Sequence, residues 1–208
     1  GRYIGSGIVV LTLFVICGTT LATRLANSKM PSGVMMTLPT VSEGKEAFSG
    51  DVFYVPAGRV HAIGAGAFVA EIQQTSDITY RIFDYNRKDA NGKSRELHTS
   101  LAYEAIDFQD VEDDPRTQYE HLQNEPVEVI ASPYFTTSVY DMTEEITCDY
   151  SELDSFVIFI CVEGSCSLID DEGNKIGMQA GETILFPATT QEITIVPDSH
   201  VKLLETYV

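Results

Sequence analysis

The stretch Gly50-Asp51-Val52-Phe53-Tyr54-Val55-Pro56-Ala57 is echoed later in the chain as Gly181-Glu182-Thr183-Ile184-Leu185-Phe186-Pro187-Ala188. Each copy consists of a glycine, an acid, four residues that suit a strand, a proline and an alanine. Glycine beside an acid is typical of a tight turn, and proline ends a strand where its missing N–H does least harm. The echo therefore predicts two similar β units, each with a turn that leads into a short strand.

The two copies differ just after the proline. The first copy continues with Gly58 and His61, whereas the second has Thr189 and Glu192 at these places. The completed first copy resembles the second signature of the cupin barrels, which runs G-[DE]-x(4)-P-x-G-x-x-H. In cupins that histidine points into the barrel and binds a metal, so the resemblance implies a metal-bearing first barrel and a metal-free second one. Without the motif, a lone histidine is more often a hydrogen-bonded core or surface residue.

The pattern around both copies is mainly β. Short alternating segments separated by glycine and proline predict an antiparallel barrel or sandwich. One segment changes to a helical period, with apolar residues spaced for one face between Ser94 and Ile106. The sequence predicts a mainly β fold of two cupin-type (jelly-roll) barrels, the first incomplete, with one interrupting helix near 94–106. The expected strands are 52–55, 67–72, 79–83, 135–140, 146–150, 156–161, 165–169, 182–186, 192–196 and 201–206.

The predicted organisation has four parts. They are an unmatched N-terminal segment (1–48), a partial catalytic cupin domain (49–108), an acidic linker (109–126) and a C-terminal metal-free cupin domain (127–208). The apolar stretch 8–17 has three open interpretations: a leader or anchor, a buried strand or helix, or the trace of a truncated gene. A cytoplasmic protein is expected, with export or membrane tethering through residues 8–22 as the alternative.

Charge narrows the possible partners. The 31 acidic and 13 basic residues give a formal net charge of −18, which argues against a nucleic-acid surface because phosphate backbones are bound by clustered cations. A membrane partner is not expected either, and the oligomeric state is left open. Five basic residues nevertheless fall within fifteen positions, which suits either an anionic small substrate or a solvated loop: Arg81, Arg87, Lys88, Lys93 and Arg95.

The segments after His61 point to one cupin family. The runs from Tyr54 to Gly66, Glu71 to Asp77 and Thr79 to Arg87, the segment Arg95-Glu-Leu-His-Thr and the tail Leu203-Leu-Glu-Thr-Tyr-Val resemble the bacterial type I mannose-6-phosphate isomerases of the short class II form. The resemblance covers about residues 50–208. It implies reversible conversion of mannose 6-phosphate to fructose 6-phosphate through a cis-enediol, assisted by zinc.

Site residues follow from the same resemblance. His61 matches a zinc ligand, and Arg81 matches the active-site arginine, whose forked cation suits an enediolate or phosphate oxygen. Glu71 is the candidate proton shuttle or hydroxyl anchor. Tyr80, Arg87 and Lys88 are weaker candidates for contact with the phosphorylated hexose. The competing interpretations are a surface strand arginine for Arg81 and a plain ion pair for Glu71.

Two ligand segments of the family, Gln-Val-His-Pro and Lys-Thr-Glu-Met-Trp-Tyr, do not occur in this sequence, which has no Trp and no His before His61. Because catalytic zinc usually has three protein ligands, the single zinc ion would have an incomplete ligand set here. This leaves open that the chain is inactive. It also leaves open the alternative of a non-enzymatic sugar-binding or regulatory cupin.

Overall fold

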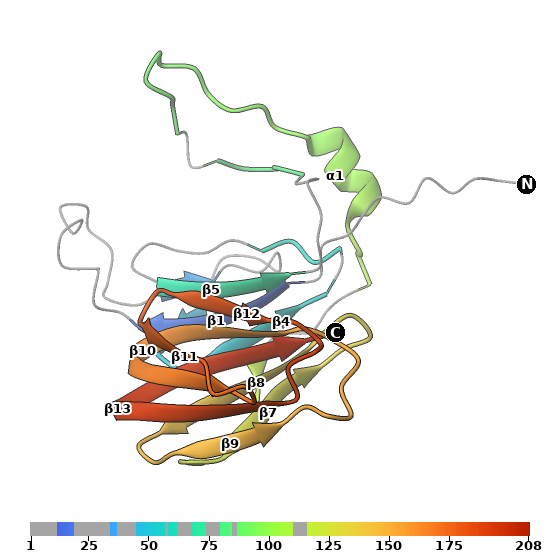
Figure 1. The fold of residues 1–208 in the computed structure, drawn as a ribbon. Coiled ribbons are helices and arrows are strands. Elements are labelled where there is room, and N and C mark those ends of the chain that lie inside the picture. Colours follow the sequence, from blue (N-terminus) through green and yellow to red (C-terminus); the bar gives the residue numbers. More distant parts are fainter. Residues whose placement is uncertain are drawn as a thin grey trace, which may run out of the picture. The chain divides into compact units, whose positions relative to one another are not determined.

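The computed structural model describes residues 12–18, 34–36, 45–56, 58–61, 68–73, 80–84, 87–109 and 116–208. The chain divides into two compact units, residues 1–115 and 116–208. The described residues are mainly β with one short helix (Figure 1). The elements of the first unit are β1 (Thr12–Gly18), β2 (Val34–Met36), β3 (Lys45–Ala47), β4 (Val52–Val55), β5 (Phe68–Gln73) and α1 (Thr99–Ala105).

In the first unit, β1 lies between β5 and β4, and both of its pairings are antiparallel. β2 pairs with β3 in a separate two-stranded sheet. Of the three interpretations of the apolar stretch 8–17, residues 12–18 follow the strand. Residues 8–11 lie outside the described part of the chain. No helix among the described residues is long and apolar enough to cross a membrane. On β4, Val52, Phe53 and Val55 are fully buried.

In the first unit, the strand predicted at 79–83 is wrong, and the predicted helix is confirmed with a later start. Residues 80–83 form no strand, because the backbone of Arg81 bonds to His98 and not to a neighbouring strand; Thr79 lies outside the described residues. The helix begins at Thr99 and not at Ser94. Ser94 pairs with Lys88 in an isolated bridge, so this end of the segment is held in an extended conformation.

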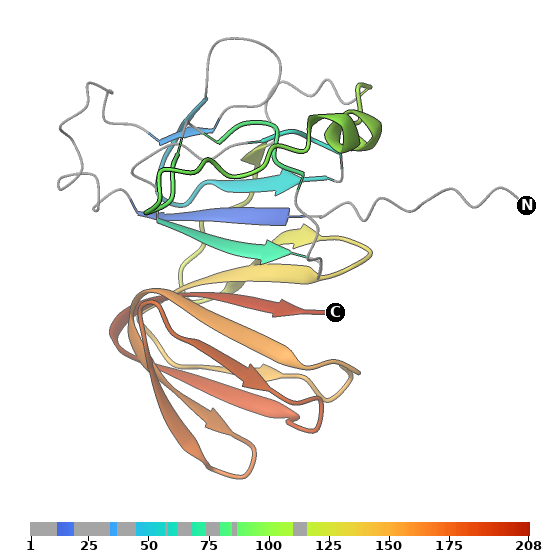
Figure 2. The ribbon, with the colours of Figure 1, turned by 90° about the horizontal axis from the view of Figure 1, so that it is seen from above.

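The second unit is an antiparallel sheet in the order β11-β10-β13-β8-β7, with β12 added to β10 and β9 added to β13. Figure 2 shows the long strands of this unit, in orange and red, bending strongly along their length. The strands of this sheet are β7 (Pro126–Ala131), β8 (Thr136–Met142), β9 (Ile146–Asp149), β10 (Val157–Asp170), β11 (Lys175–Gln179), β12 (Thr183–Phe186) and β13 (Glu192–Tyr207). The two-residue strand β6 (Arg116–Thr117) is not part of it.

β10 and β13 are each one continuous strand where the sequence predicted two. The expected break near Gly164 is a pair of register shifts, between Cys161 and Glu163 and between Gly164 and Cys166. Such bulges bend a strand without ending its pairing. β7 and β11 were not predicted at all.

The core of the second unit is built from β8, β10, β12 and β13. Phe159 is fully buried and meets the rings of Tyr140 and Phe186 edge-on, with centroids 6.3 and 6.2 Å apart. Edge-to-face contacts at these separations stabilise aromatic pairs beyond their area burial. The surrounding core residues are Met142, Tyr150, Val157, Cys161, Cys166, Leu168, Met178, Ile193, Ile195, Val201 and Leu203.

The sequence echo corresponds to one turn that is built twice. The first turn spans Phe48–Asp51 and the second spans Gln179–Glu182. In both, the N–H of the last residue donates to the carbonyl of the first at 3.0 Å. The carboxylate of the last residue accepts from the N–H of the first, at 2.8 Å in the first turn and 2.9 Å in the second. Gly50 and Gly181 occupy the same left-handed conformation, with φ of 94° and 92°. The glycine-acid pair is thus explained by turn chemistry.

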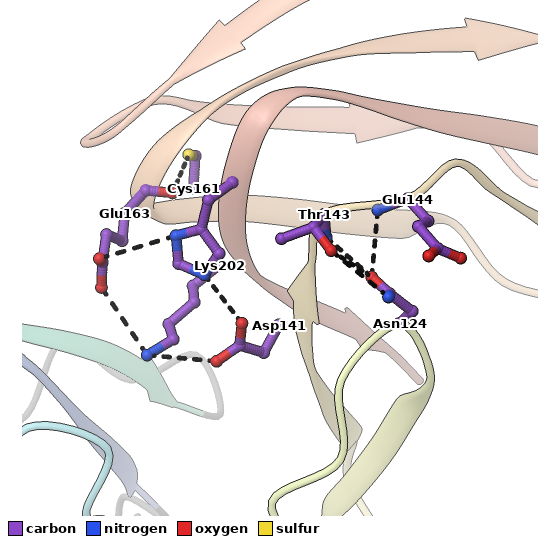
Figure 3. A network of polar contacts seen from close by, with 8 residues as sticks. Asn124, Asp141, Thr143, Glu144, Cys161, Glu163 and Lys202 are labelled. Atoms are coloured by element: carbon purple, nitrogen blue, oxygen red, sulfur yellow. Dashed lines mark hydrogen bonds and ion pairs between the residues drawn. The ribbon is translucent and has the colours of Figure 1, made fainter.

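A polar network joins three strands of the second unit (Figure 3). Lys202 on β13 lies opposite Asp141 on β8 and Glu163 on β10, with Nζ 3.3 and 3.8 Å from their carboxylates. His200 adds a contact from Nε2 to Asp141 at 2.8 Å. Burial raises the pKa of Asp141, but the hydrogen bonds from His200 and Lys202 outweigh it, so the pKa is lowered overall. The bulge at Glu163 brings its carboxylate within reach of Lys202.

Candidate functional site

The histidine of the first motif copy is half-buried in the turn after β4. Its Nδ1 lies 3.2 Å from the carbonyl oxygen of Arg59, and since a carbonyl can only accept, Nδ1 carries the proton. In a neutral ring the lone pair is then on Nε2. This is the arrangement in which histidines ligate metals, with one nitrogen orienting the ring and the other facing the ion. His61 can supply one metal ligand.

The backbone conformation and the close packing of the turn explain why residue 58 is a glycine. Its φ of 87° lies in the left-handed region, and a Cβ there would be 2.9 Å from the Asp107 nitrogen and 3.0 Å from the Ala105 oxygen. Its carbonyl accepts a hydrogen bond from the Asp107 N–H at 3.0 Å. The turn that carries His61 is thereby closely packed against the end of α1. Thr189 replaces this glycine in the second copy and does not share its conformation, because Asn124 is the one non-glycine residue with a positive φ among the described residues.

Arg81 is held by the segment that leads into α1. Its backbone N–H donates to Nδ1 of His98 at 3.1 Å, and the His98 N–H donates back to the Arg81 carbonyl at 2.7 Å. Nη1 of Arg81 donates to the carbonyl of Glu96 at 3.3 Å. The backbone and the guanidinium of Arg81 are therefore fixed by residues 96–98.

Asp84 organises the basic cluster that the sequence suggested. It is buried, and both its carboxylate oxygens accept from Arg95, from Nε at 2.8 Å and from Nη2. The hydrogen bond from Arg95 lowers the pKa of Asp84, and the positive charges of Arg95, Arg81 and Arg87 lower it further. Three arginines thus act on one carboxylate, and this part of the chain is an ordered charge cluster.

The remaining predicted residues lie around this cluster or apart from it. Tyr80 meets the His98 ring edge-on, with centroids 6.5 Å apart. Arg87 and Lys88 are exposed, Arg87 shortly after Asp84 and Lys88 in the bridge to Ser94. Glu71 is exposed on β5. The contacts that hold Arg81 and Arg95 do not include His61 or Glu71.

The residues that the structure describes do not complete a zinc site. They contain no group of three His, Cys, Asp or Glu side chains that could hold a metal ion. His61 has the tautomer of a ligand, but a catalytic zinc needs further protein ligands. The fit to zinc is therefore limited to one residue.

The interior of the second unit has a different polar centre. Glu205 is buried on β13 and accepts hydrogen bonds from Tyr140 at 3.0 Å and from Tyr150. Burial raises the pKa of Glu205, although the two tyrosine hydroxyls and Ser138 lower it in part. Burial likewise raises the pKa of both tyrosines, and the charge of Glu205 adds to this. Burial thus raises the pKa of all three acids, and the hydrogen bonds that they make to one another suit a structural role.

Sequence reasoning missed two residues of the first unit. His98 lies inside the predicted helical segment 94–106, yet it precedes the observed helix, makes no capping bond with its side chain and instead contacts Arg81. Asp84 was overlooked beside the basic residues that it pairs with. The sequence signal for this contact was the run Arg95-Glu-Leu-His98, which places charged and hydrogen-bonding side chains just before a helix.

Comparison with known proteins agrees with this architecture. The family model of the mannose-6-phosphate isomerase cupin domain matches residues 127–208. Mannose-6-phosphate isomerase ManA of Bacillus subtilis is 36% identical over 139 residues, which is 66% of this chain and 43% of that protein. The putative mannose-6-phosphate isomerase YvyI of Bacillus subtilis is 34% identical over 147 residues, 70% of this chain and 46% of that protein.

A solved structure extends the match. The crystal structure of the mannose 6-phosphate isomerase from Bacillus subtilis superposes with a TM-score of 0.75 at 25% identity, over 96% of this chain and 65% of that one. The antiparallel sheet and the repeated turn-and-strand motif place the chain in the cupin class. The chain is a homologue of the mannose-6-phosphate isomerases and carries the cupin domain of that family. It spans a little under half the length of these curated relatives.

Proposed function

We propose that this chain acts as an aldose-ketose isomerase that interconverts mannose 6-phosphate and fructose 6-phosphate. The observation that carries the proposal is the fixed position of Arg81 in a homologue of these isomerases: its backbone is bonded in both directions to His98, and its guanidinium donates to Glu96. An active-site cation must be preorganised in this way to stabilise charge that develops during a reaction.

In the proposed reaction, a base removes the proton from carbon 2 of the aldose and a proton is returned to carbon 1. The electron pair of that C–H bond forms the double bond between carbons 1 and 2 of the cis-enediol, and the former carbonyl oxygen on carbon 1 takes up a proton. When carbon 1 is protonated, the hydroxyl on carbon 2 loses its proton and becomes the ketone, so atoms and charge balance without an oxidant. Glu71 is the proposed proton shuttle, since it is an exposed carboxylate able to accept and return a proton. Arg81 stabilises the negative oxygen of the enediolate.

The phosphate of the sugar would be bound by cations near this position. Arg87 and Lys88 are exposed and follow Asp84, and Tyr80 lies against His98. A charged phosphate oxygen accepts strong hydrogen bonds from Arg and Lys. These three residues are the proposed substrate contacts.

Zinc is the proposed metal, with His61 as one ligand. Because the described residues do not provide a group of three ligands, no step above depends on the metal. Metal analysis of the purified chain tests this assignment directly. About one zinc per chain that is lost in the His61→Ala variant would support the isomerase with His61 as a ligand, whereas no zinc would support the binding protein.

The wider organisation is proposed on the same basis. Residues 49–108 would be part of a catalytic cupin barrel, 109–126 a linker and 127–208 a second, metal-free barrel, in a cytoplasmic protein. The turn shared by 48–51 and 179–182 supports two related barrels, since it has the same hydrogen bonds in both places.

A coupled assay of mannose 6-phosphate conversion tests the function. The Arg81→Gln variant removes one positive charge from the proposed site, and we expect a loss of about 100- to 1,000-fold in kcat, the usual effect of removing a charge-stabilising donor. Lys175→Gln removes one charge from exposed β11 and serves as the matched control. Equal activity of the two variants would refute the role of Arg81.

The second candidate is a non-enzymatic sugar-binding cupin. It is favoured by the missing group of three metal ligands among the described residues. Calorimetric titration with mannose 6-phosphate separates the two functions. Binding without turnover supports the binding protein, whereas binding with turnover supports the isomerase.

A further inference from the structure

We infer that His98 is a positioning residue for the reaction, which acts by holding Arg81 through its Nδ1 atom. The inference rests on the isomerase function proposed above and adds a residue to it. His98 lies 17 positions after Arg81, so the contact is made by the fold and not by local sequence.

The contact replaces half of a strand pairing with a side chain. In an ordinary antiparallel pair, two residues exchange N–H to carbonyl bonds in both directions. Here the His98 N–H donates to the Arg81 carbonyl at 2.7 Å, but the Arg81 N–H donates to the imidazole at 3.1 Å. One of the two hydrogen bonds that hold the Arg81 backbone therefore depends on an acceptor in the side chain of residue 98.

The contact also selects one form of the ring. A backbone N–H can only donate, so Nδ1 must have its lone pair available and the proton of the neutral ring must be on Nε2. In the other tautomer or in the protonated ring, an N–H would face the Arg81 N–H. His98 thus has one functional form, neutral with Nε2 protonated.

The ring is not engaged in capping the helix that it precedes. His98 is the residue before α1, and its carbonyl accepts from the Ala102 N–H at 2.8 Å, yet its side chain makes no capping bond. The Tyr80 ring lies edge-on to it, with centroids 6.5 Å apart. The imidazole therefore bonds to Arg81 and not to the helix that it precedes.

Residues 96–98 also hold the other end of Arg81. The guanidinium donates to the Glu96 carbonyl at 3.3 Å, two residues before His98. Loss of the Nδ1 acceptor removes one of the two bonds that hold the Arg81 backbone, while the 2.7 Å bond from the His98 N–H and the guanidinium bond to Glu96 remain. A shift of about 1 Å in a catalytic group can lower the rate by about 100-fold.

Two substitutions separate the effect of the hydrogen-bond acceptor from the effect of side-chain packing, because Asn and Leu both branch at Cγ as histidine does. In His98→Asn the Oδ1 atom occupies nearly the place of Nδ1 and still accepts, whereas His98→Leu has no acceptor. We expect kcat to fall by about 10- to 100-fold in His98→Leu with a smaller change in KM, and to stay within about threefold of wild type in His98→Asn. His121→Asn, at an exposed histidine of the other unit, is the control.

A second measurement does not depend on activity. We expect the Arg81 amide to exchange its proton about tenfold faster in His98→Leu than in wild type or His98→Asn, as for the loss of one hydrogen bond. Nitrogen-15 spectra of the ring should show the Nε2-protonated tautomer of His98. Equal exchange in all three proteins, or equal kcat in the Asn and Leu variants, overturns the inference. A wild type without turnover overturns the proposed function instead, and the exchange data still decide whether His98 holds Arg81.

Discussion

Substitution of Gly58 by alanine tests how the motif turn is attached to the helix. An alanine with positive φ costs about 1–2 kcal/mol at any position. At Gly58 the new Cβ would also lie 2.9 Å from the backbone nitrogen of Asp107. The two segments must separate by a few tenths of an ångström, which weakens the 3.0 Å hydrogen bond between the Asp107 N–H and the Gly58 carbonyl. That bond contributes about 1 kcal/mol, so the expected total is about 2–3 kcal/mol.

Gly92 provides the matched control for this prediction. It has a φ of 77°, and a Cβ added to it would meet no atom within 4 Å, so Gly92→Ala carries the conformational cost alone. The assay is amide exchange at Asp107, because local opening reports the free energy of this contact without assuming that both units unfold together. We expect exchange about five- to tenfold faster in Gly58→Ala and unchanged in Gly92→Ala, as the loss of one hydrogen bond implies. Equal exchange at Asp107 in the two variants would refute the close-packing argument.

Three further predictions concern buried groups. Because the pKa of Glu205 is raised, the folded state is, with respect to this group, most stable at low pH and loses stability as pH rises from about 4.5 through the folded pKa of this group. Glu205→Gln should remove this decline of the unfolding free energy above about pH 4.5, and an unchanged slope contradicts the prediction. The hydrogen bond from Arg95 lowers the pKa of Asp84, so the stability that this carboxylate contributes is present above about pH 3.8 and is lost as pH falls further. Asp84→Asn should remove this loss of stability in acid. Coincident acid-unfolding curves of the variant and the wild type would argue against this role of Asp84. Phe159→Ala should cost about 3–5 kcal/mol in urea unfolding, and Phe156→Ala, at a partly exposed site, should cost much less; similar losses in both would disprove the core assignment.

The turn and strand that the sequence echo predicts could be read from the sequence because they depend on local chemistry. A glycine with positive φ followed by an acid that accepts a backbone N–H makes the same turn at 48–51 and at 179–182. β4 follows the first turn at the predicted residues 52–55, and β12 follows the second turn one residue after the predicted start at 182; each has four residues.

Elements that depend on distant partners were predicted less well. The interval around Gly164 has the composition of a turn, but pairing of β10 with β13 continues on both sides of it through two register shifts. A single long strand results because many cross-strand bonds outweigh a local irregularity. The strand predicted at 79–83 failed for the opposite reason, since the described part of it has His98 as its partner in place of a strand.

The candidate site was predictable in its residue types and not in its contacts. The basic residues near Arg81 were recognised from their spacing, whereas the buried carboxylate of Asp84 that orders them was not. The contact between Arg81 and His98 joins a side chain to a backbone group 17 residues away, and no periodicity predicts such a bond. The roles of His61, Glu71 and Arg81 stay predictions that need activity data.

Conversion of mannose 6-phosphate labelled with carbon-13 at carbon 2 tests most directly whether this chain is an isomerase. Carbon 2 is a secondary alcohol in the aldose and becomes the ketose carbon in fructose 6-phosphate, so one spectrum recorded over time separates turnover from binding. We expect the ketose signal to appear with the wild-type chain supplied with zinc and to form at least about 100-fold more slowly with Arg81→Gln. A wild-type chain that binds the sugar phosphate but never produces the ketose signal would contradict it.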